Sequence, residues 1–143
     1  RLSNHMEVRV AGYPAEMLTA NNTSAPLEPV IATTSIMHLF TFDSGKVDLF
    51  AVAPSTVGEQ GSSGGPVADT DGNIIGLITT RGNTVEEGVR SMRALTLSYI
   101  DRTLTADTGL DLAHTVTGDV PLRAKIFHNT IAPYLQRLLL DTP

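Results

Sequence analysis

The sequence predicts a mainly β fold with helices confined to its C-terminal part, and three observations support this prediction. Residues 7–97 contain short segments rich in β-branched and aromatic residues, separated by clusters of Gly, Pro, Asn, Asp and Ser. After Leu97, apolar residues recur every three or four positions, which indicates helices. The chain has 143 residues and is 41% hydrophobic, which is enough for one domain with a buried core.

Six segments of the β region have the composition of strands, and each is bounded by residues that favour turns. Residues 7–11 alternate in polarity and stop at Gly12-Tyr13-Pro14, and the Asp71-Gly72 pair marks a tight hairpin turn. Polar segments with glycine or proline are expected as loops or turns, at 20–29, 43–46, 53–66 and 81–88. The expected strands are 7–11, 30–42, 47–52, 67–68, 74–78 and 89–97.

The helical pattern begins where the last expected strand ends. Leu97, Ile100 and Leu104 share one face of an expected helix of about ten residues. Ser98 is the expected N-cap of this helix, and Gly109 follows its end.

Residues 106–120 are expected to form a polar linker to a second helix, which Pro121 would open. Pro133 lies inside this second helix and is expected to kink or split it. An apolar stripe along the helix either packs against the β region or binds a partner. The stripe consists of Phe127, Ile131, Tyr134, Leu135 and Leu138.

Composition excludes several classes of protein. Ten Lys and Arg against fifteen Asp and Glu give a net charge of −5, which argues against a nucleic-acid binder or a polybasic membrane-surface protein. No apolar run is long enough to span a bilayer, and the absence of cysteine removes disulfides, thiol catalysis and thiolate zinc sites. The four histidines form no H-x-x-x-H pair, and we expect no metal or cofactor.

Because the chain starts at Arg1 without a secretory segment, we expect a processed product, a recombinant form or a fragment.

Residues 58–67, with the sequence GEQGSSGGPV, form the segment that carries chemistry, and three interpretations compete. A flexible Gly/Ser linker is one, although apolar strand patterns flank the segment. A nucleophile elbow is the second, because residues 61–65 match G-x-S-x-G, but that motif must open a helix. Pro66 and the Asp71-Gly72 turn leave no room for such a helix.

The third interpretation is the G-x-S-G-G-P loop of a serine peptidase, carried by residues 61–67, by the hairpin at 71–79 and by VAGYP at 10–14. On these motifs the sequence resembles trypsin-like (chymotrypsin-fold) serine peptidases of bacterial type, over residues 7–105. The resemblance implies a six-stranded antiparallel Greek-key barrel, the second half of a chymotrypsin-like double barrel, with a short C-terminal helix. Residues 1–105 would form this barrel half, and residues 106–143 a linker and helical tail.

The resemblance implies that Ser63 is the nucleophile and that the main-chain amides of Gly61 and Ser63 form the oxyanion hole. Amide hydrolysis passes through a tetrahedral oxyanion, which needs N–H donors directed at one point. A glycine at position 61 lets the backbone approach a ligand closely. Ser62 is expected to be a neighbour of the nucleophile and not the nucleophile itself.

The resemblance also places peptide binding. The strand Thr79-Thr80-Arg81 would lie beside an extended peptide or protein substrate and pair with its backbone. Residues 55–60 and 79–82 would form the walls of the specificity pocket, with Gln60 among them and Val57 near its base. An acidic group at the base of this pocket would select Lys or Arg, and none stands at that position, although Glu59 lies close to it in the sequence. We expect the pocket to take a small to medium apolar side chain.

A serine hydroxyl needs an oriented base, and in this family the His and the Asp come from the first barrel. His5 and His38 precede Ser63, but neither has the family's histidine context. We therefore expect a C-terminal barrel half that is inactive alone. Its expected partner is the missing N-terminal barrel with the His and Asp, or a second copy bound through the exposed barrel face, and not nucleic acid or a membrane. The resemblance alone favours a secreted or periplasmic location.

Two other functions stay open. A non-catalytic pseudo-protease or peptide-binding module would keep the barrel and use residues 79–81 as a docking edge without hydrolysis. An α/β-hydrolase-type esterase would require a parallel sheet and a helix after Ser63.

Overall fold

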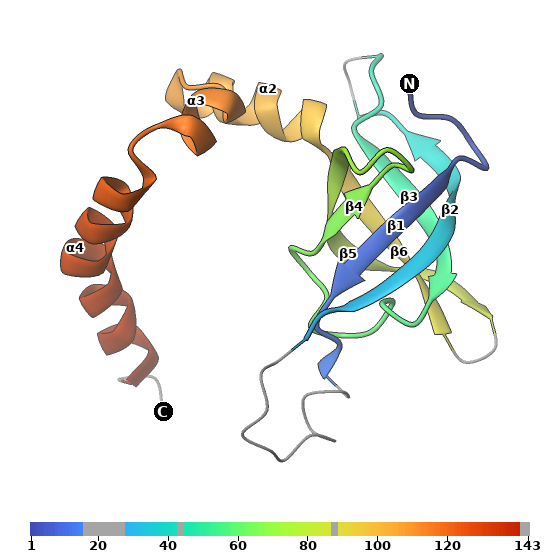
Figure 1. Ribbon diagram of the computed structural model, residues 1–143, viewed down its shortest axis with the longest axis horizontal. Helices are drawn as coiled ribbons and strands as arrows, with labels where there is room; N and C mark the ends of the chain where they lie inside the picture. Colours follow the sequence, from blue (N-terminus) through green and yellow to red (C-terminus); the bar gives the residue numbers. More distant parts are fainter. Residues whose placement is uncertain (16–27, 43–44, 87–88, 141–143) are drawn as a thin grey trace. The chain divides into compact units, whose positions relative to one another are not determined.

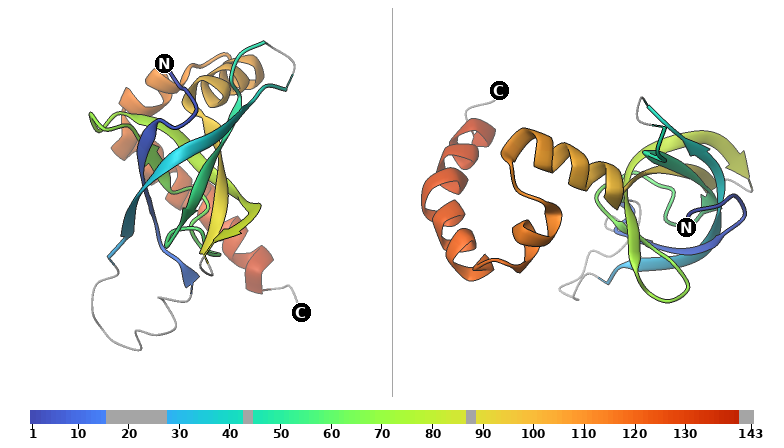
Figure 2. Two further views of the ribbon diagram at one scale, coloured as in Figure 1. Left: turned by 90° about the vertical axis from the view of Figure 1, so that its right-hand side faces the viewer. Right: turned by 90° about the horizontal axis from the view of Figure 1, so that it is seen from above.

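Six antiparallel strands close into a barrel in the order β1-β2-β3-β6-β5-β4. The structure is a computed structural model that describes residues 1–15, 28–42, 45–86 and 89–140 (Figure 1). The view along the barrel in Figure 2 shows the strands arranged as a ring. The strands are β1 (Glu7–Gly12), β2 (Val30–Phe40), β3 (Leu49–Ser55), β4 (Pro66–Ala68), β5 (Ile74–Glu86) and β6 (Val89–Thr96). The predicted mainly β fold with C-terminal helices is confirmed.

The barrel closes between β1 and β4, where Arg9 pairs with Ala68 and Val10 with Val67. The strand alternation expected for residues 7–11 is present, because Val8 and Val10 point into the barrel while Glu7 and Arg9 are exposed. Burial of alternate side chains fixes the register of β1 against both of its neighbours.

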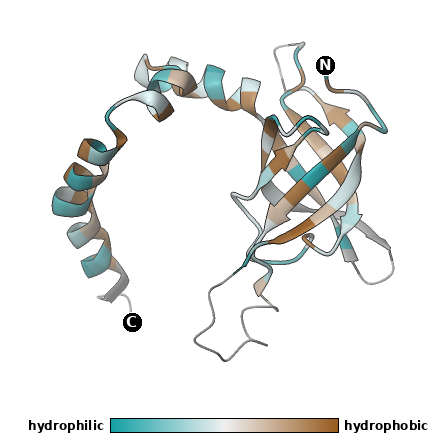
Figure 3. Ribbon diagram, in the orientation of Figure 1, coloured by the Kyte–Doolittle hydropathy of each residue, from teal (hydrophilic) through white to brown (hydrophobic). Residues whose placement is uncertain are grey.

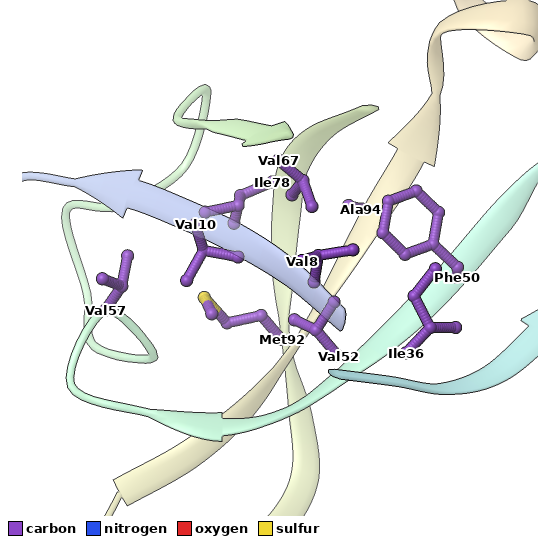
Figure 4. Packing of buried hydrophobic residues seen from close by; sticks show 10 residues of the cluster. All are labelled: Val8, Val10, Ile36, Phe50, Val52, Val57, Val67, Ile78, Met92 and Ala94. Atoms are coloured by element: carbon purple, nitrogen blue, oxygen red, sulfur yellow. The ribbon is translucent and has the colours of Figure 1, made fainter. Parts of the chain in front are cut away.

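The core of the barrel consists of apolar side chains from all six strands and from the loop after β3 (Figure 4). Phe50 is the largest of the fully buried residues. Gly76 lies opposite its ring, and a Cβ at that position would come within 2.7 Å of the ring. The core residues are Val8, Val10, Ile36, Phe50, Val52, Val57, Val67, Ile78, Met92 and Ala94.

The prediction of a loop at residues 81–88 is wrong for residues 81–86, because strand β5 continues to Glu86. Arg81 pairs with Met92, and Glu86 pairs with Val89. The register shifts between Arg81 and Val85, so part of the predicted loop is an irregularity inside the ladder. Predicted segments 20–27, 43–44 and 87–88 lie outside the described residues.

Helix α2 (Leu97–Thr108) follows β6 directly, and its cap differs from the prediction. The Oγ1 of Thr96, not of Ser98, accepts a hydrogen bond from the Tyr99 N–H at 3.0 Å. The same hydroxyl donates to the Val47 carbonyl at 3.0 Å, so one residue joins the helix start to the barrel. Gly109 has φ +75 and ends the helix, as predicted.

The chain divides into two compact units, Arg1–Asp101 and Arg102–Pro143. Within the second unit, the predicted linker contains helix α3 (Leu112–Thr117), which Asp111 caps by accepting from the His114 N–H at 2.7 Å. The Asp111 side chain thereby satisfies one of the N–H groups that have no partner inside the helix.

Helix α4 (Val120–Leu140) has Pro121 in its first turn, as predicted, and continues past Pro133, so the predicted split does not occur. The five residues of the predicted apolar stripe are between 42% and 62% exposed. Figure 3 shows apolar and polar bands alternating along α4. Among the helices that the structure describes, none has both the length and the apolar run needed to cross a bilayer. The assignment of the stripe to packing or to a partner stays a prediction.

Candidate active site

Ser63 lies in the serine turn, which we define as residues 61–65, directly before β4. Its side chain is exposed, and its hydroxyl donates a hydrogen bond to the Thr79 carbonyl of β5 at 3.3 Å. Pro66 opens a strand of three residues after the turn, so no helix follows the serine. The turn therefore presents a hydroxyl to solvent without the surroundings of a nucleophile elbow.

Ser62 has the opposite environment. Its residue is only 2% exposed, and its hydroxyl has no hydrogen-bond partner among the described residues. It packs against Gly12 of β1, where a Cβ would come within 2.7 Å of the Ser62 hydroxyl. Of the two adjacent serines, only Ser63 is accessible to a substrate.

Hydrogen bonds fasten one side of the serine turn to β5. The Gly64 N–H donates to the Ile78 carbonyl at 2.8 Å, and the Ile78 N–H donates to the Gly65 carbonyl at 2.8 Å. Inside the turn, the Gly65 N–H donates to the Ser62 carbonyl at 3.0 Å. These three bonds hold the backbone on both sides of Ser63.

The other side of the serine turn lies against the β1 extension, which we define as residues 13–15. A Cβ on Gly61 would come within 2.5 Å of the Tyr13 carbonyl oxygen, and the Ala15 N–H donates to the Gln60 carbonyl at 2.6 Å. Gly61 also has φ +102, in the region that favours glycine. Both its conformation and its close neighbours therefore require glycine at position 61.

Two main-chain amides beside Ser63 are free to bind a ligand. Within the part of the chain that the structure describes, the N–H groups of Gly61 and Ser63 have no hydrogen-bond partner. Both residues are exposed, so a ligand can reach these donors. Free N–H donors next to a hydroxyl are the groups that stabilise an oxyanion during acyl transfer.

Two pockets meet at Ser63. The first pocket, of about 330 Å³, is lined by residues 58–63 together with Ile78, Thr80 and Met92. The second, of about 490 Å³, is lined by residues 11–13, Pro29 and residues 61–66. Residues 61–63 line both, so the Ser63 hydroxyl lies between a pocket next to β5 and β6 and a pocket next to β1.

The first pocket contains some of the predicted substrate-binding residues and not others. Gln60 and Thr80 line it, and Thr79 contributes the carbonyl that accepts from Ser63. Val57 is not among the described lining residues; it is fully buried in the barrel core, and its place near the pocket base stays a prediction. The backbone of Arg81 is part of β5, and its side chain lies outside the described part of the chain.

Ile78 and Met92 line the first pocket instead, and neither was predicted to do so. They are 4% and 1% exposed, so they belong to the barrel core and to the pocket wall at once. Their strand positions predict a core role, and no sequence signal distinguishes a core residue that also borders a cavity. Glu59 also lines this pocket, so a carboxylate shares it with apolar side chains.

The described linings of these two pockets contain no histidine. His38 is exposed on β2, where its ring contacts Phe40 edge-on at 6.3 Å. The His5 N–H is bonded to the Ile36 carbonyl at 2.7 Å. The described residues thus supply a hydroxyl and two donors to this site, without an imidazole beside them.

Comparisons of the chain with protein-family models and with curated proteins find no match.

Proposed function

We propose that this chain is the serine-bearing unit of a serine endopeptidase, which hydrolyses peptide bonds through an acyl-enzyme at Ser63. The observation that carries the proposal is the exposed Ser63 hydroxyl, which lies between two pockets. Beside it are two main-chain amides that have no hydrogen-bond partner among the described residues. A hydroxyl, two donors and an adjacent side-chain pocket are the groups that acyl transfer from a peptide requires.

In the proposed reaction the Ser63 Oγ attacks the carbonyl carbon of the peptide bond while a base takes the hydroxyl proton. The N–H groups of Gly61 and Ser63 bind the negatively charged oxygen of the tetrahedral intermediate. When the intermediate collapses, the C–N bond breaks and the amine leaves with the proton from the base. Water then attacks the acyl group by the same route and restores the Ser63 hydroxyl.

The arrangement of β5 supports a peptide as substrate. The pairing of β4 with β5 runs from Ala68 with Ile74 to Pro66 with Leu77, so β4 covers only the first part of β5. Beyond Ile78, the edge of β5 next to the serine turn is not paired with β4. An extended peptide docked along residues 79–81 would pair with this edge and place a side chain in the first pocket. Ile78 and Met92 favour a medium-sized apolar side chain there.

The general base has to come from outside the residues that line the two pockets. We propose that a barrel half with a His and an Asp docks beside the second pocket, and that the present barrel is the second half of a chymotrypsin-like pair. The strand order β1-β2-β3-β6-β5-β4 is compatible with the Greek-key arrangement of such a half. In the absence of that partner, we expect Ser63 to react slowly with fluorophosphonates and substrates.

A small external base provides a direct test with this chain alone. We expect imidazole to promote acylation of the chain by a p-nitrophenyl ester of an N-acylated leucine, because imidazole can enter the open site beside Ser63 and accept its proton. Intact mass spectrometry would measure the acylated fraction, and peptide mapping would locate the acyl group on Ser63. Without imidazole, the rate should be at least about tenfold lower.

Two variants serve as matched controls. Ser63→Ala should abolish the imidazole-dependent adduct, and Ser62→Ala should leave it unchanged because that hydroxyl is buried. An adduct that survives Ser63→Ala would contradict the proposal. Strong labelling of Ser63 without imidazole would show that the chain already contains its base.

A peptide-binding module without hydrolysis is the second candidate, and the lack of an imidazole in the described pocket linings favours it. It predicts peptide binding that persists in Ser63→Ala and no acylation with imidazole. The third candidate, an α/β-hydrolase-type esterase, does not fit a closed antiparallel barrel in which a three-residue strand follows the serine turn.

A further inference from the structure

We propose that the main-chain N–H of Ala15 is a positioning group for the oxyanion site. By binding the Gln60 carbonyl, it holds the Gln60–Gly61 peptide in the orientation that keeps the Gly61 N–H free beside Ser63. This inference rests on the proposed function, because it concerns how one of the two oxyanion donors is oriented. Nothing in the serine motif itself points to Ala15, which lies far from it in the sequence.

The contact is a short hydrogen bond, 2.6 Å from the Ala15 nitrogen to the Gln60 oxygen. The described chain has no cis peptide bond, so the C=O of Gln60 and the N–H of Gly61 point in opposite directions. A carbonyl fixed toward Ala15 therefore fixes the Gly61 N–H away from Ala15. Ala15 therefore orients the Gly61 N–H through the Gln60 carbonyl and makes no contact with a substrate itself.

The second donor is oriented in the same way but by a local contact. The Ser62 carbonyl accepts from the Gly65 N–H at 3.0 Å, so the Ser63 N–H points away from Gly65. The serine turn thus holds one of its two donors by itself. The other donor depends on the β1 extension.

Gly61 makes this dependence important. Glycine rotates about φ and ψ at low cost, so a Gln60–Gly61 peptide without an external contact can turn over. A turned peptide would direct the Gln60 carbonyl oxygen to the place of the N–H, where it would repel a negatively charged oxygen. The hydrogen bond from Ala15 opposes this rotation.

The test compares variants that keep or remove the Ala15 N–H. Ala15→Pro removes the donor, and Ala15→Ser is the matched control that keeps it. The probe is a tetrapeptide that ends in leucine with a free carboxylate, whose oxygen can occupy the oxyanion site. Amide NMR of the full chain would follow the Gly61 and Ser63 protons during the titration.

We expect both amide protons to move downfield in the wild type and in Ala15→Ser. In Ala15→Pro the Ser63 proton should still move, the Gly61 proton should not, and the affinity should fall by about 10- to 100-fold. Equal Gly61 shifts in the wild type and in Ala15→Pro would overturn the inference alone. If the chemical shift of neither amide proton changes in the wild type, both the proposed function and this inference are wrong.

A second variant removes the dependence on how well the chain tolerates proline. Semisynthesis can replace the peptide bond between Pro14 and Ala15 by an ester, which deletes the N–H and leaves the side chain and φ unrestricted. The barrel should keep its dispersed amide spectrum, and the Gly61 response alone should be lost. Retention of the Gly61 response in the ester variant would overturn the inference.

Discussion

The glycines of the serine turn differ in what a side chain would meet, although all of them belong to one motif. At Gly61 a Cβ would come within 2.5 Å of the Tyr13 carbonyl oxygen, whereas at Gly64 nothing lies within 4 Å. Both have positive φ values, +102 and +85. A residue with a Cβ would therefore be strained at either position, and only at position 61 would it also collide with the β1 extension.

This difference predicts two unequal alanine substitutions. Gly64→Ala should lower the free energy of unfolding by about 1–2 kcal/mol, from backbone strain alone. Gly61→Ala should cost more than Gly64→Ala, because the Tyr13 carbonyl must also move away. Urea denaturation followed by circular dichroism would measure both. Equal losses would show that the β1 extension does not restrain the turn.

The sequence predicts those site residues that belong to one continuous motif, and it does not predict those that reach the site through tertiary contacts. Ser63 and Gly61 belong to one short motif, and the structure brings them together in the serine turn, where the exposed Ser63 hydroxyl donates to the Thr79 carbonyl. The sequence could not place Val57 more exactly, because an apolar residue beside a polar loop can face a pocket or the core, and Val57 packs in the core. The Ala15 contact depends on chain segments distant in sequence, and a backbone N–H leaves no mark on residue type.

At the scale of elements, Thr96 joins β6, α2 and the segment before β3 through one hydroxyl. Thr96→Ala should reduce the free energy of unfolding by about 1–2 kcal/mol, because it removes the helix cap and leaves the buried Val47 contact unmade. Thr96→Ser is the control that retains the oxygen, and it should lose less than half as much. Thermal denaturation would measure the change, and a stable Thr96→Ala variant would contradict the assignment of the cap.

The hairpin turn between β4 and β5 has a carboxylate at its centre. The Asn73 side-chain amide and N–H and the Asp71 N–H donate to Asp69, and these hydrogen bonds lower the pKa of its carboxyl below the ordinary value of 3.8. A folded-state pKa below the unfolded one adds stability at pH values above 3.8, and this stability is lost as the pH falls through the folded-state value.

We therefore expect Asp69→Asn to be less stable than the wild type at pH 7 and equal to it near pH 2. The amide keeps an acceptor oxygen, so the comparison isolates the charge of Asp69. Urea denaturation at several pH values would measure the difference. A difference that does not change between pH 7 and pH 2 would exclude the carboxylate as its cause.

Element prediction succeeded where local patterns agreed with tertiary contacts. The alternation in β1 and the Asp71-Gly72 turn specified their elements, since side-chain period and positive φ are local properties. The length of β5 was not predictable, because its last residues are strand only by pairing with β6. The α2 cap was assigned to Ser98 since the chain offers two hydroxyls there, and the contact of Thr96 with Val47 is invisible in sequence.

At the scale of the whole molecule, the barrel core of the first unit, as far as the structure describes it, ends at Ala94. Removal of residues 110–143 should therefore leave a folded barrel with an unfolding free energy within about 1 kcal/mol of the full chain, provided that α2 is retained. Tyr99 of α2 packs edge-on against Phe42 at 5.2 Å, and this contact would be preserved. Circular dichroism and thermal denaturation would test the truncated chain.

The same truncation decides between the two roles predicted for the α4 stripe. Burial of five large apolar side chains against the barrel would contribute several kcal/mol, so a loss of more than about 3 kcal/mol would assign the stripe to internal packing. An unchanged barrel would assign it to a partner.

The attachment of the serine turn to β1 on one side and to β5 on the other has a consequence for biosynthesis. Residues 11–15 are made early, and the Ile78 partner is made after the serine, so the two supports meet only when the ring of strands is complete. A nascent or misfolded polypeptide therefore lacks the hydrogen bonds that hold the backbone on both sides of Ser63.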